Sequence, residues 1–169
     1  MQRYAVIGHP ISHSRSPYIH SAFAAQFGQQ IDYQRIDCEP QNFRSTVRDF
    51  FDGNSGGMSV TVPHKSTAFD MCDHLSEAAQ SAGAVNTLYL DEQGRLCGDN
   101  TDGRGLVNDL MFNHHLSLKD QHVLIIGAGG ATRGLIGPFM DAGVASLSIA
   151  NRTVERAMAI AKHWSHRYS

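Results

Sequence analysis

The sequence has 169 residues, of which 41% are hydrophobic and 18% are charged, and its formal net charge is −2. This length and composition are typical of a globular chain with one good core or two small ones. The chain has neither a basic run of the kind that binds nucleic acid nor an apolar stretch long enough to span a bilayer, so we expect neither partner.

The N-terminus and the cysteines favour a cytoplasmic location. Residues 1–6 run directly into a strand pattern and lack the pattern of a secretory signal. The cysteines are odd in number and widely spaced, at Cys38, Cys72 and Cys97, which fits a reducing compartment. No third ligand is spaced to join His9 and His13 or the pair His114-His115, so we expect no metal.

The first predicted strand, residues 4–8, leads into a loop that is rich in hydroxyl groups. Ser16 and Pro17 then start a helix with an apolar stripe, formed by Ile19, Phe23 and Phe27, that stops at Gly28. The hydroxyl groups of Ser14 and Ser16 beside free N–H groups predict an anion pocket of a size for a carboxylate. An alternative left open by these residues is that both serines only cap the helix.

Two further strands are predicted over residues 31–37 and 58–62, with a helix from Pro40 to Gly53 between them. Lys65 follows the strand at 58–62 and precedes another helix. Ligands of open α/β sheets bind at the carboxyl ends of the strands. Lys65 is therefore predicted to lie where it can take part in a reaction of a bound ligand.

A short helix from Ser76 to Gly83 and a hairpin of residues 84–90 and 95–98 complete an α/β domain. Residues 98–105 are small and polar and predict a hinge. Asp102 lies at the start of the helix that follows, where the helix dipole favours its ionised form. The alternative is that Asp102 is a plain helix cap.

An apolar strand at residues 123–126 runs into a glycine turn and then a helix. Glycines at 127 and 129 allow a tight turn that approaches a pyrophosphate closely, although Thr132 stands where a third glycine is usual. We therefore predict the first phosphate-binding turn of a dinucleotide fold.

The strand at residues 146–150 is followed by Asn151-Arg152-Thr153, where an NAD enzyme has an acidic residue. Arg152, with Arg156 one helical turn later, suits the 2′-phosphate of NADP because a guanidinium grips a phosphate at two points. The alternative is that both arginines are ordinary solvated charges at a helix start.

Together these stretches resemble the N-terminal part of the shikimate dehydrogenase family over nearly the whole chain. The stretches are residues 10–17, 59–65, 83–87 with 98–103, and 127–131 with 151–153. The resemblance implies an NADP-dependent oxidoreductase that interconverts 3-dehydroshikimate and shikimate in aromatic amino-acid biosynthesis. It also implies an N-terminal α/β substrate domain, residues 1–101, and an incomplete Rossmann-type NADP-binding domain with its hinge helix, residues 102–169.

The resemblance also implies roles for individual residues. Ser14 and Ser16 would hold the substrate carboxylate, and the ring hydroxyls and reacting oxygen would contact Thr61, Asn86, Lys65 and Asp102. Lys65 would carry the proton, with Asp102 as its partner. The pyrophosphate would bind Gly127, Ala128, Gly129, Gly130 and Ala131. The 2′-phosphate would bind Asn151, Arg152, Thr153 and Arg156, while Glu77 would lie near the nicotinamide.

Two features depart from the family pattern. Ser59 stands where the family usually carries Asn, and the chain ends at Ser169, short of the family length. We therefore expect this form to lack measurable turnover and to self-associate through its C-terminal segment, for instance as a homodimer that pairs sheet edges. The alternatives are a catalytically silent shikimate-binding module and an enzyme that acts on quinate or a similar acid.

Overall fold

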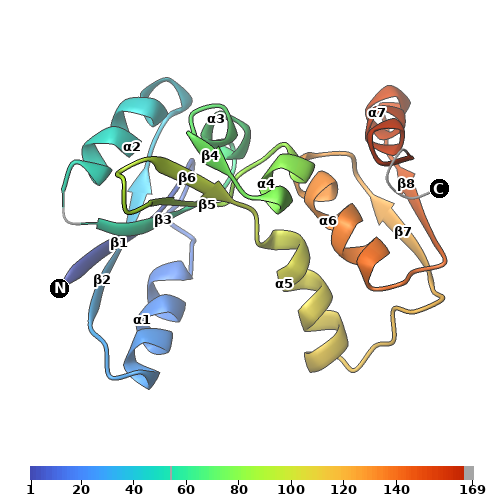
Figure 1. The fold of residues 1–169 in the computed structure, drawn as a ribbon, viewed down its shortest axis with the longest axis horizontal. Helices are drawn as coiled ribbons and strands as arrows, with labels where there is room; N and C mark the ends of the chain where they lie inside the picture. Colours follow the sequence, from blue (N-terminus) through green and yellow to red (C-terminus); the bar gives the residue numbers. More distant parts are fainter. Residues whose placement is uncertain (54, 166–169) are drawn as a thin grey trace. The chain divides into compact units, whose positions relative to one another are not determined.

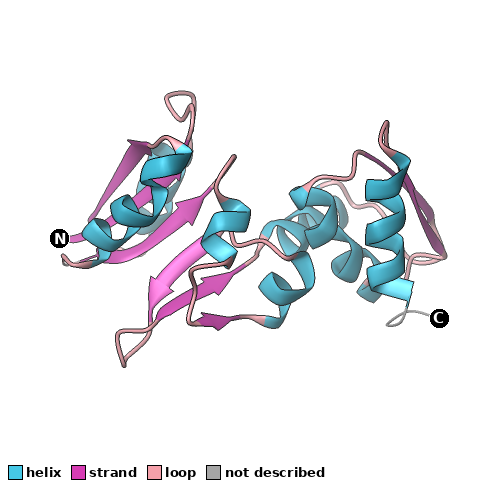
Figure 2. Cartoon of the chain, turned by 90° about the horizontal axis from the view of Figure 1, so that it is seen from above, coloured by secondary structure: helices cyan, strands magenta, loops and turns pink. Residues whose placement is uncertain are grey.

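The computed structural model describes residues 1–53 and 55–165 (Figure 1). The chain forms two compact units, each of which has most of its residue contacts within itself. The first consists of residues 1–76 and 84–99, and the second of residues 77–83 and the chain from Asn100 on. Helices and strands, coloured separately in Figure 2, are both abundant, and they alternate along most of the chain, which confirms the predicted α/β class.

The first unit is built on a six-stranded sheet with the order β2-β1-β3-β5-β6-β4. β1 pairs in parallel with β2 and β3, whereas β5 is antiparallel to β3 and β6. The strands are β1 Gln2–Gly8, β2 Ile31–Asp37, β3 Ser55–Val60, β4 His74–Leu75, β5 Thr87–Leu90 and β6 Leu96–Asp99. The helices are α1 Ser16–Gln26, η1 Pro40–Asn42, α2 Phe43–Phe51 and α3 Lys65–Phe69.

Helices α1 and α2 cover opposite faces of this sheet (Figure 1). This follows from the strand order, because right-handed crossovers from β1 to β2 and from β2 to β3 run in opposite directions along the sheet. The α2 side is well packed, since Phe43, Val47 and Phe50 of this helix are buried. Other buried side chains of the unit include Ile7, Met58, Val60, Val85 and Leu88.

The structure departs from the sequence prediction at several places in this unit. The hairpin strand predicted from residue 84 begins at Thr87. The predicted strand at 58–62 starts earlier and ends at Val60, so Thr61 lies in the loop beyond it. The two-residue strand β4 was not predicted because it is too short to show alternation. The apolar stripe of α1 exists, but Ile19, Phe23 and Phe27 are exposed among the described residues, and α1 has no buried residue.

The second unit contains a two-stranded parallel sheet, β7 His122–Ile126 and β8 Ser146–Ala150, with Ile126 opposite Ala150. Its helices are α4 Glu77–Ala82, α5 Asp102–Asn108, the π-helical turn η2 Asp109–Asn113, α6 Gly130–Asp141 and α7 Val154–Ser165. The interior holds two clusters of buried side chains. One contains Val107, Leu118, Phe139 and Val144, and the other contains Ile136, Ile160 and Trp164.

Helices α5 and α6 approach closely at a pair of glycines. A Cβ atom on Gly103 would lie 2.0 Å from the carbonyl oxygen of Gly134, so only glycine fits at position 103. Helix α4 also packs against α6 and therefore belongs to this unit. By contacts the unit boundary falls between Asp99 and Asn100. The predicted division into a substrate domain, residues 1–101, and an incomplete NADP-binding domain, residues 102–169, stays a prediction.

Candidate functional site

The predicted substrate residues of the first unit lie around one edge of its sheet. The parallel strands β1 and β3 end there, at Gly8 and Val60, and the antiparallel strand β5 begins there at Thr87. The loop before α1, the loop before α3 and the segment before β5 all leave this edge. Loops at the carboxyl ends of strands are the usual place for ligands in α/β sheets.

The two serines of the first loop are hydrogen-bonded to each other. The hydroxyl group of Ser14 donates to Oγ of Ser16 at 3.1 Å and accepts from the N–H of Ser16 at 3.3 Å. The hydroxyl proton of Ser16, at the first residue of α1, remains available to a ligand. The pair thus offers a ligand one hydroxyl proton at the start of α1, and its role as an anion pocket stays a prediction.

Lys65 is the first residue of α3, and its backbone is held by the segment before β5. Its carbonyl oxygen accepts a hydrogen bond of 2.9 Å from the N–H of Val85. Asn86 is fixed in the same way, since its carbonyl oxygen accepts from the N–H of Val60 at 2.7 Å and its side-chain Oδ1 accepts from Thr87 at 2.8 Å. The N–H of Thr61 donates to the carbonyl oxygen of Ile7 at 3.0 Å. Main-chain bonds therefore hold the three predicted residues Thr61, Lys65 and Asn86.

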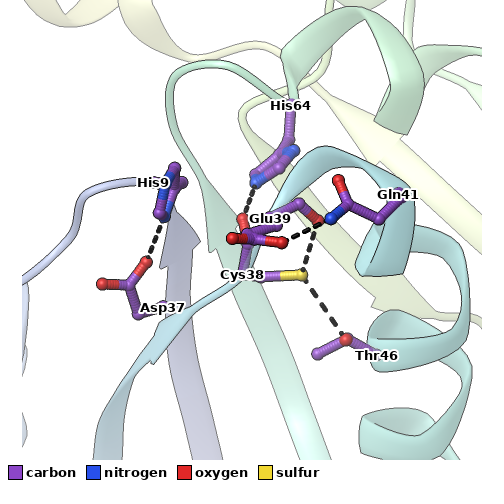
Figure 3. A network of polar contacts seen from close by, with 7 residues as sticks. All are labelled: His9, Asp37, Cys38, Glu39, Gln41, Thr46 and His64. Atoms are coloured by element: carbon purple, nitrogen blue, oxygen red, sulfur yellow. Dashed lines mark hydrogen bonds and ion pairs between the residues drawn. The ribbon is translucent and has the colours of Figure 1, made fainter.

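His64, which sequence reasoning did not single out, anchors the residue before Lys65. Its side chain is 1% exposed, and its ring stacks on Phe43 with centroids 4.5 Å apart. Nε2 donates a hydrogen bond of 2.8 Å to the carbonyl oxygen of Cys38 (Figure 3). Burial lowers the pKa of His64, and this outweighs the opposing effect of the hydrogen bond to Cys38. The ring is thus a neutral spacer between α3 and the chain that leaves β2.

Asp102 and Glu77 belong to the second unit. Asp102 is the first residue of α5, as predicted, and its N–H donates to Oδ1 of the buried Asn100 at 3.2 Å. Glu77 is the first residue of α4, which packs against the helix that follows the glycine turn. The pairing of Lys65 with Asp102 joins residues of different units and stays a prediction.

The glycine turn between β7 and α6 has the geometry of a phosphate cradle. Gly127 has φ +116°, a conformation that side chains rarely adopt, and the helix begins at Gly130. A Cβ atom placed on Gly127, Gly129 or Gly130 would meet nothing within 4 Å, so the space in front of the turn is open. The first N–H groups of a helix have no partner inside it, and α6 therefore presents donors to that space.

Two side chains hold this turn in place. Thr132, at the position of the usual third glycine, is buried and donates from Oγ1 to the carbonyl oxygen of Gly127 at 2.9 Å. Asn151 accepts from the N–H of Ala128 at 3.1 Å and donates from Nδ2 to the carbonyl oxygen of Thr153 at 2.6 Å. Asn151 thus connects the turn after β7 to the turn after β8. The departure from the glycine pattern at Thr132 is structurally explained.

Arg152 and Arg156 lie beyond β8, and both side chains are exposed. Within residues 1–53 and 55–165, neither guanidinium has a carboxylate within ion-pair distance. Uncompensated arginines beside a phosphate cradle fit the phosphate-rich, 2′-phosphorylated cofactor that the sequence predicts.

The same described residues contain no sign of a metal centre or of a membrane-spanning helix. No three or more His, Cys, Asp or Glu side chains gather there as metal ligands, and no helix there is long and apolar enough to cross a membrane. An apolar cavity of about 370 Å³ lies among α6, β8 and α7, with Met140, Met158 and Trp164 in its wall. It contains none of the predicted site residues.

Comparison with known proteins gives the family. A family model for the shikimate dehydrogenase substrate binding domain matches residues 6–88, and a model for shikimate / quinate 5-dehydrogenase matches residues 109–169. The chain belongs to the shikimate dehydrogenase family. The first match contains the serines and Lys65, and the second contains the glycine turn and Arg152.

Individual known proteins resemble this chain in sequence and fold. Shikimate dehydrogenase (NADP(+)) of Marinobacter nauticus is 49% identical over 98% of this chain and 60% of the relative. The structure of the Ael1 enzyme from Pseudomonas putida has a TM-score of 0.93 at 42% identity, over 98% of this chain and 61% of that one. Shikimate 5-dehydrogenase from Thermus thermophilus, in complex with NADP(H) and shikimate, has a TM-score of 0.88 at 36% identity, over 97% and 61%. The chain thus spans about 60% of the length of these relatives.

Proposed function

We propose that this chain belongs to an NADP-dependent oxidoreductase that interconverts 3-dehydroshikimate and shikimate. The proposal rests on one observation in a chain of this family: each of the two units has its own group of predicted site residues. A lysine and hydroxyl-bearing side chains meet at one sheet edge of the first unit, and the second unit has an open phosphate cradle with uncompensated arginines.

The residues of the second unit fit the cofactor. Open space in front of Gly127, Gly129 and Gly130 accommodates a pyrophosphate, and Arg152 and Arg156 would grip the 2′-phosphate. When bound, NADPH supplies a hydride to the carbonyl carbon of the substrate. The chain's own groups must then bind and orient the acid and protonate the oxygen that the reduction leaves behind.

Ser14 and Ser16 would hold the substrate carboxylate, and Thr61 and Asn86 would contact ring hydroxyls. Lys65 would donate its ammonium proton to the carbonyl oxygen as that oxygen becomes an alkoxide, and Asp102 would orient Lys65. In the reverse direction the neutral lysine accepts the hydroxyl proton. The rigid backbone around Lys65 suits this role, because proton transfer requires the donor within hydrogen-bond reach of the acceptor.

The proposal is tested by an assay of the whole protein with NADP and shikimate, with NAD and quinate as parallel arms. We expect turnover with shikimate and NADP. Turnover with quinate alone would indicate the related acid as the substrate. Binding of shikimate without any turnover would indicate a silent binding module.

Two further proposals concern association between copies of the chain and its location in the cell. We propose that the 169-residue chain associates with itself, because β7 and β8 are the only strands of their sheet among the described residues and unpaired strand edges favour pairing. Light scattering tests this, and a monodisperse monomer contradicts it.

We propose a cytoplasmic location because Cys38, Cys72 and Cys97 are all free thiols, as in reducing compartments. Cell fractionation tests it.

A further inference from the structure

Arg35, which sequence reasoning did not select, reaches the serine loop from the outer strand β2. Its Nε–H donates a hydrogen bond of 2.8 Å to the carbonyl oxygen of Ser14. In the sheet Arg35 lies opposite Val6, on the same face as Tyr33 two residues earlier. The ring of Tyr33 stacks on His20 of α1 at 4.5 Å, so this face is the one that α1 covers. The guanidinium is therefore fixed beside the N-terminus of α1.

No acidic side chain among the described residues pairs with Arg35, whose guanidinium has no carboxylate of those residues within ion-pair distance. The next acidic side chain on the same face, Asp37, pairs instead with Nδ1 of His9 at 2.6 Å. Within residues 1–53 and 55–165 Arg35 uses only its Nε–H, which leaves the N–H donors of its Nη groups for a ligand.

The serine pair itself cannot supply this charge. Ser14 uses its hydroxyl proton on Ser16, so the pair offers a ligand one hydroxyl proton and no net charge. Arg15 stands between the serines, but its exposed side chain makes no hydrogen bond within the described residues and is not held toward them. Arg35, by contrast, is held beside the serines by its hydrogen bond to the carbonyl oxygen of Ser14.

We propose that Arg35 supplies the positive charge that binds the substrate carboxylate at the Ser14–Ser16 pocket. The inference rests on the proposed function, because it takes a cyclic hydroxy acid as the ligand. It adds a residue to the pocket and a reason for acid specificity, since a fixed guanidinium favours a carboxylate over the neutral ester or amide of the same ring.

The test compares shikimate with its neutral methyl ester, using calorimetric binding to the whole protein. Arg35→Met should raise the Kd for shikimate by about tenfold or more, as expected for the loss of one charge-assisted contact. It should change the Kd for the ester by less than about twofold, since the ester has no charge to lose. Arg35→Lys keeps the charge and should recover part of the affinity for shikimate.

Arg48→Met is the matched control, because it removes one exposed arginine of the same unit that has no bond to the serine loop. It should leave both Kd values unchanged. The inference is overturned if Arg35→Met weakens the binding of acid and ester equally, or weakens neither. It is also overturned if a selective loss of affinity for the acid occurs only with Arg15→Met.

Turnover with NADP on the same samples separates the inference from the proposed function. A wild-type protein that binds shikimate without oxidising it contradicts the proposed function and leaves the comparison of Arg35 variants valid. A wild-type protein that binds neither compound contradicts both.

Discussion

The N–H of Val85 donates a hydrogen bond of 2.9 Å to the carbonyl oxygen of Lys65, which fastens the first turn of α3 to the segment before β5. Val60 and Asn86 form a second bond of 2.7 Å between β3 and that segment. Two stretches that lie about twenty residues apart in the sequence thus share one rigid frame. A lysine on such a frame is suited to proton transfer, which tolerates little positional error.

Lys65→Ala should therefore lower turnover by about 100-fold or more, because the substrate oxygen loses its proton donor. Shikimate binding should suffer far less, since the serines and Asn86 remain. Steady-state kinetics and calorimetry on the whole protein measure the two effects separately. Lys119→Ala, an exposed lysine of the second unit, is the control and should change neither. Near-normal turnover of the Lys65 variant across pH would make Lys65 a binding residue only.

Much of this arrangement could be predicted because it follows from local sequence. The strand, glycine turn and helix at residues 122–141 show their period and their turn residues in the sequence itself. The same is true of the strand that ends before Lys65, apart from its limits, since Thr61 and Val62 alternate like strand residues but lie beyond the last strand pair.

Other features depend on partners far along the chain and leave no local signal. His64 bonds a carbonyl group 26 residues away, and Arg35 bonds one 21 residues away. The packing of α4 against α6 is likewise a long-range contact. The exposed stripe of α1 shows the converse, because helical spacing predicts a helix but does not identify what covers its apolar face.

Arg152→Ala should weaken NADP binding by about 1–3 kcal/mol through the loss of a charge-assisted contact with the 2′-phosphate. NAD binding should hardly change, because NAD has no phosphate at that position. Titration with both cofactors measures the difference. Lys162→Ala, which removes a positive charge from the last turn of α7, serves as the control. If NADP and NAD weaken equally, Arg152 supports the fold instead.

Asn151→Leu should give the opposite pattern. Asn151 connects the N–H of Ala128 to the carbonyl oxygen of Thr153, so its loss loosens the phosphate turn itself. Both cofactors carry the pyrophosphate that binds there, and both should weaken by a similar factor, about tenfold for each 1.4 kcal/mol lost. A loss restricted to NADP would show instead that Asn151 acts on the 2′-phosphate.

Gly103→Ala should destabilise the second unit by about 1–3 kcal/mol, because the added Cβ overpacks the contact between α5 and α6. That Cβ would lie 2.0 Å from the carbonyl oxygen of Gly134. Gly105, two residues later in the same helix, is the matched control, since a Cβ there meets nothing within 4 Å. Gly105→Ala should stabilise the protein by about 0.5–1 kcal/mol by restricting the unfolded chain. Denaturant unfolding decides, and equal effects of the two changes would contradict the close approach.

His64 should make the stability of the first unit depend on pH. Burial lowers the pKa of His64 below its ordinary value of 6.5. The unfolded chain therefore binds a proton at a higher pH than the folded protein does. The contribution of neutral His64 to the free energy of unfolding is therefore fully present above about pH 6.5. It is lost progressively as the pH falls toward the pKa of His64 in the folded protein. Burial lowers the pKa of His20 as well, so part of the loss belongs to that residue.

His64→Phe separates the two contributions. Phenylalanine keeps a ring against Phe43 but loses the bond to the carbonyl oxygen of Cys38, so the variant should be less stable by about 0.5–1.5 kcal/mol at pH 8. Because phenylalanine cannot bind a proton, the difference from wild type should shrink as the pH falls to about 5, a range in which most carboxylates stay ionised. Denaturant unfolding at several pH values measures this slope. His13→Gln, at an exposed histidine of the same unit, should keep the wild-type slope. If the slope of His64→Phe also equals that of wild type, another group causes the acid sensitivity, and His64 contributes only its packing and its hydrogen bond.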